Sequence, residues 1–124
     1  MNVAQYPHNV YLYRQRESKQ DANGYITENG DGEWIFICKG RFEGNGKGQT
    51  VTTDTATKEI ISGIVYCKPL VFIPSKARIL VLTEIPEEIT PQLLKRWEFL
   101  GKVKVNGINL KTVKDQLNTK LYIN

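Results

Sequence analysis

Apolar residues occur along this chain of 124 residues in short runs that turn residues interrupt, and the most apolar stretch spans residues 57–82. That stretch is rich in Ile, Val, Leu, Tyr and Phe, but no run in it approaches the roughly 20 apolar residues of a transmembrane helix. A long buried helix is excluded as well, because Pro69 and Pro74 would each remove a backbone donor and clash with the preceding turn. β-Branched residues between turn signals instead predict two or three short strands that share one core.

Two further strands are expected before this stretch. Residues 9–16 alternate Val10 and Leu12 with more polar or aromatic positions, which is typical of a half-buried strand. Residues 33–42 are apolar on both faces, which indicates a strand in the middle of a sheet.

Two long connections follow these strands, at about residues 17–32 and 43–57. The first is polar and contains the tight-turn signal Asn23-Gly24, together with a brief edge strand at 25–27. The second begins with glycines at alternate positions and continues as a Thr-rich strand or extended arm. Connections this long in a compact domain are usually functional or disordered, so we expect both to be flexible and to carry contacts.

The pattern becomes helical near residues 91–100. Thr90 is a suitable N-cap, and Pro91 suits the first helical position. Gly101 stands where a C-terminal glycine would end the helix. The apolar residues expected on one helical face are Leu93, Leu94, Trp97 and Leu100.

The chain after the helix returns to alternation. Residues 102–110 alternate around Asn106-Gly107 and predict a hairpin. Residues 109–123 fit either helical spacing or a strand, and 119–123 alternate as a closing strand does.

Together these elements predict a mainly β fold for residues 1–124. We expect a small, single-domain antiparallel β-barrel or sandwich with long loops and one short helix. The first residues have neither the basic start nor the apolar run of a signal peptide, so we expect the protein to stay in the cytoplasm of the producing cell. Cys38 and Cys67 are then expected to be buried free thiols, although a disulfide would be possible if their strands were neighbours.

The net charge of +4 is unevenly distributed along the chain. Residues 1–90 carry ten Lys or Arg against eleven Asp or Glu, whereas residues 91–124 carry seven against two. A basic end of this kind can meet nucleic acid or an acidic protein surface, and the ordinary alternative is a solvated strand face. The basic residues that we single out in this segment are Lys102, Lys104, Lys111 and Lys114.

No pattern of catalytic, metal-binding or cofactor-binding residues is complete. The sequence Gly46-Lys47-Gly48 fails as a nucleotide-binding P-loop, because Arg41 stands where the first Gly is required and Gly48 replaces the final Ser or Thr. His8 is the single histidine, which leaves no Cys/His metal set and no Ser-His-acid triad. We therefore expect no enzyme, no metal and no cofactor.

A single-stranded nucleic-acid-binding barrel is the alternative function. Such oligonucleotide-binding folds stack bases on exposed aromatic residues that are interleaved with Lys or Arg. The aromatic residues on the expected strands are Tyr11, Tyr13, Trp34, Phe36, Tyr66 and Phe72. Each of them also suits the core, which is the more ordinary place for an aromatic side chain.

Five motifs follow one another over most of the chain. They are V-Y-L-Y-R at 10–14, D-A-N-G at 21–24, E-W-I-F-I-C at 33–38, Ile-Pro at 73–74 and Q-L-N-T-K-L-Y-I at 116–123. Their order resembles the small head-closure, or stopper, proteins at the head–tail junction of tailed bacteriophages. The helix expected at 91–100 departs from that pattern.

The resemblance implies a non-catalytic β-barrel that assembles as a homo-oligomeric ring with portal or adaptor and tail proteins in the virion. The long loops would reach neighbouring subunits, the tail or the DNA, and edge strands would pair between protomers by strand addition. No membrane contact is implied. The loop residues expected to face a partner or DNA are Asn23, Gly24, Asp31, Arg41, Gly44, Gly46, Lys47, Gly48, Thr52 and Thr53.

Overall fold

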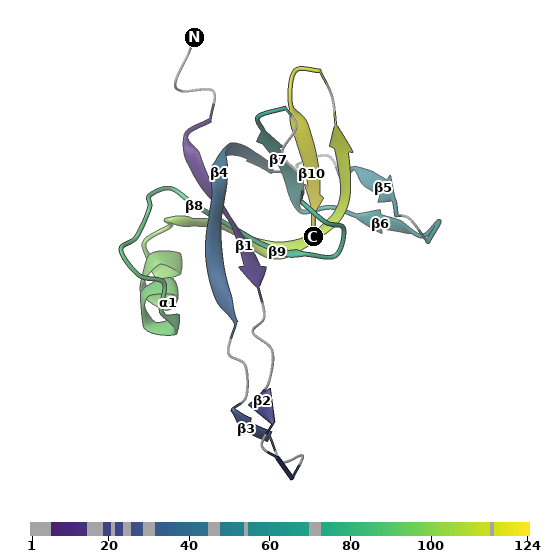
Figure 1. Cartoon of the computed structure of the whole chain (residues 1–124). Coiled ribbons are helices and arrows are strands. Elements are labelled where there is room, and N and C mark those ends of the chain that lie inside the picture. The colour runs from purple at the N-terminus through teal and green to yellow at the C-terminus, as the bar shows by residue number, and fades with distance from the viewer. Residues whose placement is uncertain are drawn as a thin grey trace.

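Six antiparallel strands close into a barrel in the computed structural model of this chain (Figure 1). In order around the ring they are β1 (His8–Arg14), β4 (Glu33–Gly44), β7 (Gly63–Cys67), β10 (Thr119–Ile123), β9 (Val103–Lys114) and β8 (Arg78–Leu82). The pairing of β8 with β1 completes the ring, so each barrel strand has a neighbour on both sides. The prediction of a mainly β fold is confirmed. Of the two predicted architectures, a barrel or a sandwich, the structure is a barrel.

Two short hairpins and one helix lie outside the barrel. They are formed by β2 (Lys19–Gln20) with β3 (Ile26–Glu28), by β5 (Thr50–Thr52) with β6 (Lys58–Ile60), and by α1 (Pro91–Phe99). The structure describes residues 6–14, 19–20, 22–23, 26–28, 32–44, 48–53, 55–69, 73–114 and 116–124. Phe72 and the middle of the glycine-rich segment therefore lie outside the described residues.

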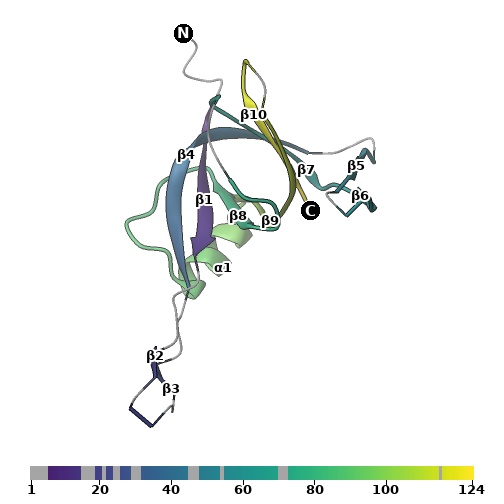
Figure 2. The same ribbon diagram turned by 45° about the vertical axis from the view of Figure 1, so that its right-hand side comes forward.

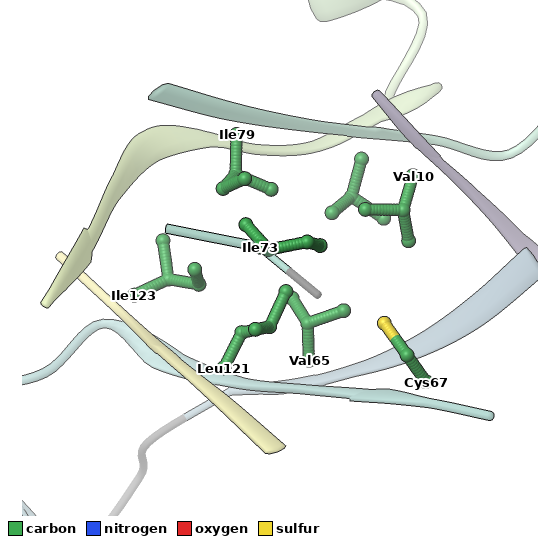
Figure 3. Close-up of a cluster of buried hydrophobic side chains, with 8 residues drawn as sticks. Val10, Val65, Cys67, Ile73, Ile79, Leu121 and Ile123 are labelled. Atoms are coloured by element: carbon green, nitrogen blue, oxygen red, sulfur yellow. The ribbon is translucent and has the colours of Figure 1, made fainter. Parts of the chain in front are cut away.

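The interior of the barrel is filled by aliphatic side chains from alternate strand positions (Figure 3). β7 and β10 both alternate buried and half-buried residues, as strands with one face in a core do. Ile73 enters the same core from the connection between β7 and β8. The buried members of this inner core are Val10, Val65, Cys67, Ile73, Ile79, Val81, Leu121 and Ile123.

Hydrogen bonds from β9 hold the connection that carries Ile73. The Asn109 side-chain amide donates to the Pro74 carbonyl at 3.1 Å and to the Thr112 hydroxyl at 2.8 Å. The Thr112 hydroxyl in turn donates to the Ile73 carbonyl at 2.8 Å. These bonds satisfy backbone groups of a segment that belongs to no strand, and they keep Ile73 inserted in the barrel.

α1 covers the outside of the barrel over β1, β8 and β9. Leu94 and Trp97 pack against a second buried cluster formed by Tyr11, Leu80 and Leu82, which point away from the inner core. β1 and β8 are consequently buried on both faces. Leu100, which the sequence placed on the packed face of this helix, is 53% exposed, because the helix ends at Phe99 and the chain turns away at Gly101.

The predicted cap, first-turn proline and terminating glycine of α1 are confirmed. The Thr90 hydroxyl accepts a hydrogen bond from the Leu93 backbone N–H at 3.1 Å, and Pro91 occupies the first turn. Gly101 has a φ of 73°, the left-handed conformation of a helix-terminating glycine.

The hairpin predicted around Asn106-Gly107 is wrong, because β9 passes through it as one strand of 12 residues. Gly107 pairs with Ile79 and lies where the carboxyl end of the chain crosses β9. A Cβ at Gly107 would stand 2.6 Å from the Asn124 carbonyl oxygen, and the Ile108 and Asn124 backbones exchange two hydrogen bonds beside it. The glycine thus permits a close backbone contact and does not form a turn. Of the two alternatives for residues 109–123, helix or strand, the strand is correct, because these residues contain the end of β9 and all of β10.

The strands expected from the apolar stretch at 57–82 are present as β6, β7 and β8. Pro69 and Pro74 both lie between strands, where neither removes a pairing hydrogen bond. The strand expected at 33–42 is β4, which lies between β1 and β7 in the ring.

Candidate functional site

The two long connections predicted to carry contacts contain the two hairpins outside the barrel. β2–β3 lies beyond the end of the barrel where β1 ends and β4 begins, and β5–β6 lies beside β7 at its flank (Figures 1 and 2). Asn23 is exposed in the turn region between β2 and β3. Gly24 and Asp31 of the same predicted set lie outside the described residues.

The β5–β6 hairpin carries the predicted residues Thr52 and Thr53. Thr52 is exposed at the end of β5, and the Thr53 backbone N–H donates to the Thr57 carbonyl at 2.9 Å to close the turn. The Thr53 and Thr55 hydroxyls are 3.0 Å apart on the same turn. Hydrogen bonds within the turn therefore hold its backbone, while its outer surface is open to a partner.

The predicted glycines flank this hairpin. Gly44 ends β4, and Gly48 has a φ of 70° before β5 begins. A Cβ at either position would meet nothing within 4 Å, so both lie in open space. Gly46 and Lys47 lie outside the described residues.

The hairpins contain the strands with a single neighbour. Every barrel strand has two neighbours, although β4 and β9 pair with each neighbour over one half only, whereas β2, β3, β5 and β6 each have one neighbour. The base of the β5–β6 hairpin is anchored by Val51 and Ile61, which are buried, but Ile60 on β6 is 64% exposed. An open edge with a large exposed aliphatic residue is a site at which another chain can add a strand.

A second exposed apolar surface lies at the end of α1. Phe99 is 89% exposed and is followed by the exposed Leu100. Ile85, in the connection before the helix, is also exposed.

The predicted basic segment is not one surface. Lys102 forms an ion pair with Glu84 at 3.0 Å, and its ammonium group lies 5.0 Å from the centre of the Trp97 ring, beside α1. Lys104 lies near His8, whose pKa is lowered first by burial and then by the charge of Lys104. Lys111 and Lys114 instead lie on the half of β9 that pairs with β10. β9 pairs with β8 over its first half and β10 over its second, so it carries its lysines to two different sides of the barrel.

Arg41 is the predicted loop residue that the structure places on the barrel itself. It points outward from β4, with its guanidinium 4.8 Å from the centre of the Tyr66 ring and its Nε 3.2 Å from Glu43 Oε1. Tyr66, one of the aromatic residues named from the sequence, lies on the same outer surface, together with Lys120 and Tyr122, which were not singled out. The alternation of residues 119–123 was sufficient to place Lys120 and Tyr122 on one face, but not to show which strand lies beside them.

The remaining aromatic residues form a second outer patch on β1 and β4. The Tyr13 and Trp34 rings meet edge to face at 5.2 Å, and the Arg78 guanidinium lies 4.8 Å from the Tyr13 ring centre. Tyr11 and Phe36 make a similar contact at 5.6 Å. All four point away from the inner core. The expectation of core packing is nevertheless confirmed for Tyr11, which is buried in the cluster under α1 with Trp34 packed against it, whereas Phe36 is 43% exposed.

A pocket of about 500 Å³ lies between this patch and the connection before α1. Its lining combines the rings of Trp34 and Phe36 with Ile85 and with the acidic residues Glu87 and Glu88. The pocket holds neither a histidine nor a cysteine, and in the described part of the chain no three His, Cys, Asp or Glu side chains are grouped as a metal site would require.

The two cysteines are free thiols on neighbouring strands, as expected. Cys67 is fully buried in the inner core, and Cys38 on β4 is partly buried beside it. The Cys67 thiol donates to Cys38, so this hydrogen bond raises the pKa of Cys67 and lowers the pKa of Cys38. Burial further raises the pKa of Cys67, which leaves that thiol protonated and unreactive.

Comparison with known proteins adds no assignment. No family model, curated protein or solved structure matches this chain. α1, the helix of the described residues, is too short and too polar to cross a membrane. The functional argument therefore rests on the surfaces of the barrel and its hairpins.

Proposed function

We propose that this protein is a non-catalytic structural assembly protein of the head–tail connector, or head-closure, type found in tailed bacteriophages. In this role it forms a homo-oligomeric ring in the virion with portal or adaptor proteins on one side and tail proteins on the other. The observation that carries the proposal is the separation of a closed barrel from two hairpins whose strands each have a single neighbour.

The hairpins are the strands that we assign to intermolecular pairing. Each hairpin strand has one edge that is open along its whole length, whereas β7 and β10 are paired along both edges and β4 and β9 pair with one neighbour over one half and with the other neighbour over the other half. Isolated two-stranded hairpins are only marginally stable in water, so a partner strand would stabilise them on assembly. The exposure of Ile60 supports the same role for β5–β6, because its side chain would be buried by the added chain.

The positions of the hairpins are consistent with a ring. A contact in which a hairpin of one protomer meets a different surface of the next is head-to-tail, and such contacts close into rings when the rotation between neighbours permits. β2–β3 and β5–β6 extend in different directions from the barrel (Figure 2), so one can contact a neighbour in the ring while the other reaches the layer above or below.

Sedimentation velocity of the full chain mixed with purified portal–adaptor assemblies tests the proposal. We expect the protein to co-sediment with these assemblies while remaining a monomer or weak oligomer alone. Ile60→Lys places a charge on the open hairpin edge and should weaken co-sedimentation at least tenfold, because a desolvated lysine is costly in an added-strand interface.

Leu117→Lys provides the matched control. Leu117 is 79% exposed in the turn between β9 and β10 and is distant in sequence from both hairpins. The control should co-sediment like the unmodified protein. Failure of the unmodified chain to associate with any virion component, or equal losses in both variants, would overturn the proposal.

A further inference from the structure

Two rows of outward side chains cross four neighbouring strands of the barrel. The strand pairings define the first row as Arg41, Tyr66, Lys120 and Val113. They define the second row as Glu43, Ile64, Tyr122 and Lys111. Val65, Cys67 and Leu121 alternate with these residues and point into the barrel (Figure 3), so both rows lie on its outer surface.

Cations on this surface outnumber carboxylates. Lys39 lies two residues before Arg41 on β4, so it lies on the same face of that strand, and it is exposed. The lysines at 39, 111 and 120 form no ion pair with a described residue. Glu43 is the one carboxylate of the two rows, and it meets Arg41 at Nε, not at the terminal Nη groups that would grip a phosphate.

Two tyrosines separate these cations. Tyr66 and Tyr122 are half-exposed on the adjacent strands β7 and β10. Tyr66 pairs with Lys120, and Tyr122 lies two residues further along β10, so the two tyrosines are diagonal neighbours with Cα atoms roughly 7–8 Å apart. We call the surface made by Lys39, Arg41, Tyr66, Lys111, Lys120 and Tyr122 the tyrosine–lysine face.

From this arrangement we infer that the tyrosine–lysine face binds single-stranded nucleic acid. Aromatic side chains that stand between cations on a sheet can stack unpaired bases while the cations meet the phosphates of the same strand. A duplex hides its bases from such rings, and an acidic protein would use the cations but gain little from the tyrosines. The interleaving of the two residue types therefore favours a single strand over either of these partners.

Fluorescence anisotropy with a labelled oligo-dT of about 12 nucleotides tests the inference, since one small barrel covers about 4–16 nucleotides. Contact with three or four phosphates predicts a slope of about −2 to −3 for log K against log salt concentration. Lys111→Gln with Lys120→Gln should lower the affinity at least tenfold and flatten this slope. Tyr66→Leu and Tyr122→Leu should each lower the affinity about tenfold while leaving the slope unchanged, because stacking does not release counterions.

A second double variant controls for total charge. Lys58→Gln with Lys95→Gln removes two exposed lysines on β6 and α1 and therefore reaches the same net charge away from the face. It should bind oligo-dT like the unmodified protein. Thermal unfolding of each variant distinguishes loss of binding from loss of folding, and the two tyrosine variants provide independent readings if one fails to fold.

Three results would overturn the inference. They are the absence of oligo-dT binding at low salt, equal losses in the two lysine double variants, and poly-glutamate binding as tight as oligo-dT binding with no effect of the tyrosine variants. The last result would assign the face to an acidic protein. None of these results tests the assembly proposal. That proposal depends on the hairpins and is tested by sedimentation with portal–adaptor assemblies.

Discussion

At the scale of single residues, the Thr112 hydroxyl makes two hydrogen bonds inside the fold. It accepts from the Asn109 amide and donates to the Ile73 carbonyl, and so links β9 to the segment that inserts Ile73 into the barrel. The segment at 73–77 is also bonded to β9 by the Asn109 amide, which donates to the Pro74 carbonyl, and by backbone hydrogen bonds between Lys76 or Ala77 and Asn109. A small side chain thus stabilises a non-strand segment inside the core.

Thr112→Val should reduce the free energy of unfolding by about 1–3 kcal/mol, because it keeps the shape of the side chain but leaves the Ile73 carbonyl without its donor. Urea denaturation measures the change. The control is Thr52→Val, at an exposed position of β5, which should alter stability by less than about 0.5 kcal/mol. Equal stability of the Thr112 variant and the unmodified protein would show that these hydrogen bonds do not hold the segment.

His8 makes stability depend on pH. Its Nδ1 accepts a hydrogen bond from the Phe42 backbone N–H at 3.1 Å, which requires the neutral ring. Burial, and secondarily the nearby Lys104, lower the pKa of His8 below its usual value of 6.5. The unfolded chain therefore binds more protons than the folded chain in the interval between the lowered pKa and 6.5, and the free energy of unfolding decreases as the pH falls through that interval.

Urea midpoints at about pH 7.5 and about pH 5.5 test this dependence. The unmodified protein should lose stability at the lower pH, and His8→Gln should lose less, because His8 is the single histidine of the chain. The same pH dependence in both proteins would contradict the account of His8.

At the scale of elements, α1 is positioned by its first turn. Thr90 caps the helix, and no residue of the helix is fully buried. Packing therefore stabilises α1 less than it stabilises a strand of the core. Local capping should therefore have a measurable effect.

Thr90→Ala should cost about 1 kcal/mol, within a range of roughly 0.5–2 kcal/mol, whereas Thr90→Ser should retain most of the stability because it keeps the accepting oxygen. Thermal unfolding together with hydrogen exchange at residues 93–97 provides the measurement. Unchanged exchange protection in the alanine variant would show that the cap does not hold the helix.

The elements also show how far the sequence is informative. α1 was predictable with its cap and its glycine because all the signals are local. The apolar stretch at 57–82 was predictable as strands because its prolines limit each run. Gly107 was misread as a turn, because the contact that requires a glycine comes from Asn124, far along the chain. The tyrosine–lysine face could not be predicted from the sequence for the same reason, since its rows depend on which strands become neighbours.

At the scale of the whole molecule, the barrel and its additions expose different groups. The barrel buries its aliphatic interior and is closed, so each of its strands has two neighbours. The hairpin strands each have one open edge, with Ile60 exposed on β6, and one side of the barrel wall carries cations with tyrosines. Assembly and nucleic-acid binding would thus use different surfaces and can be separated by mutation.

Negative-stain electron microscopy of portal–adaptor assemblies, with and without the full chain, tests the central claim most directly. The proposed role predicts an additional ring of density on the adaptor side when the protein is present, with the ring absent for Ile60→Lys and retained for Leu117→Lys. Assemblies that look the same with and without the unmodified protein, at concentrations well above those of the sedimentation experiment, would contradict it.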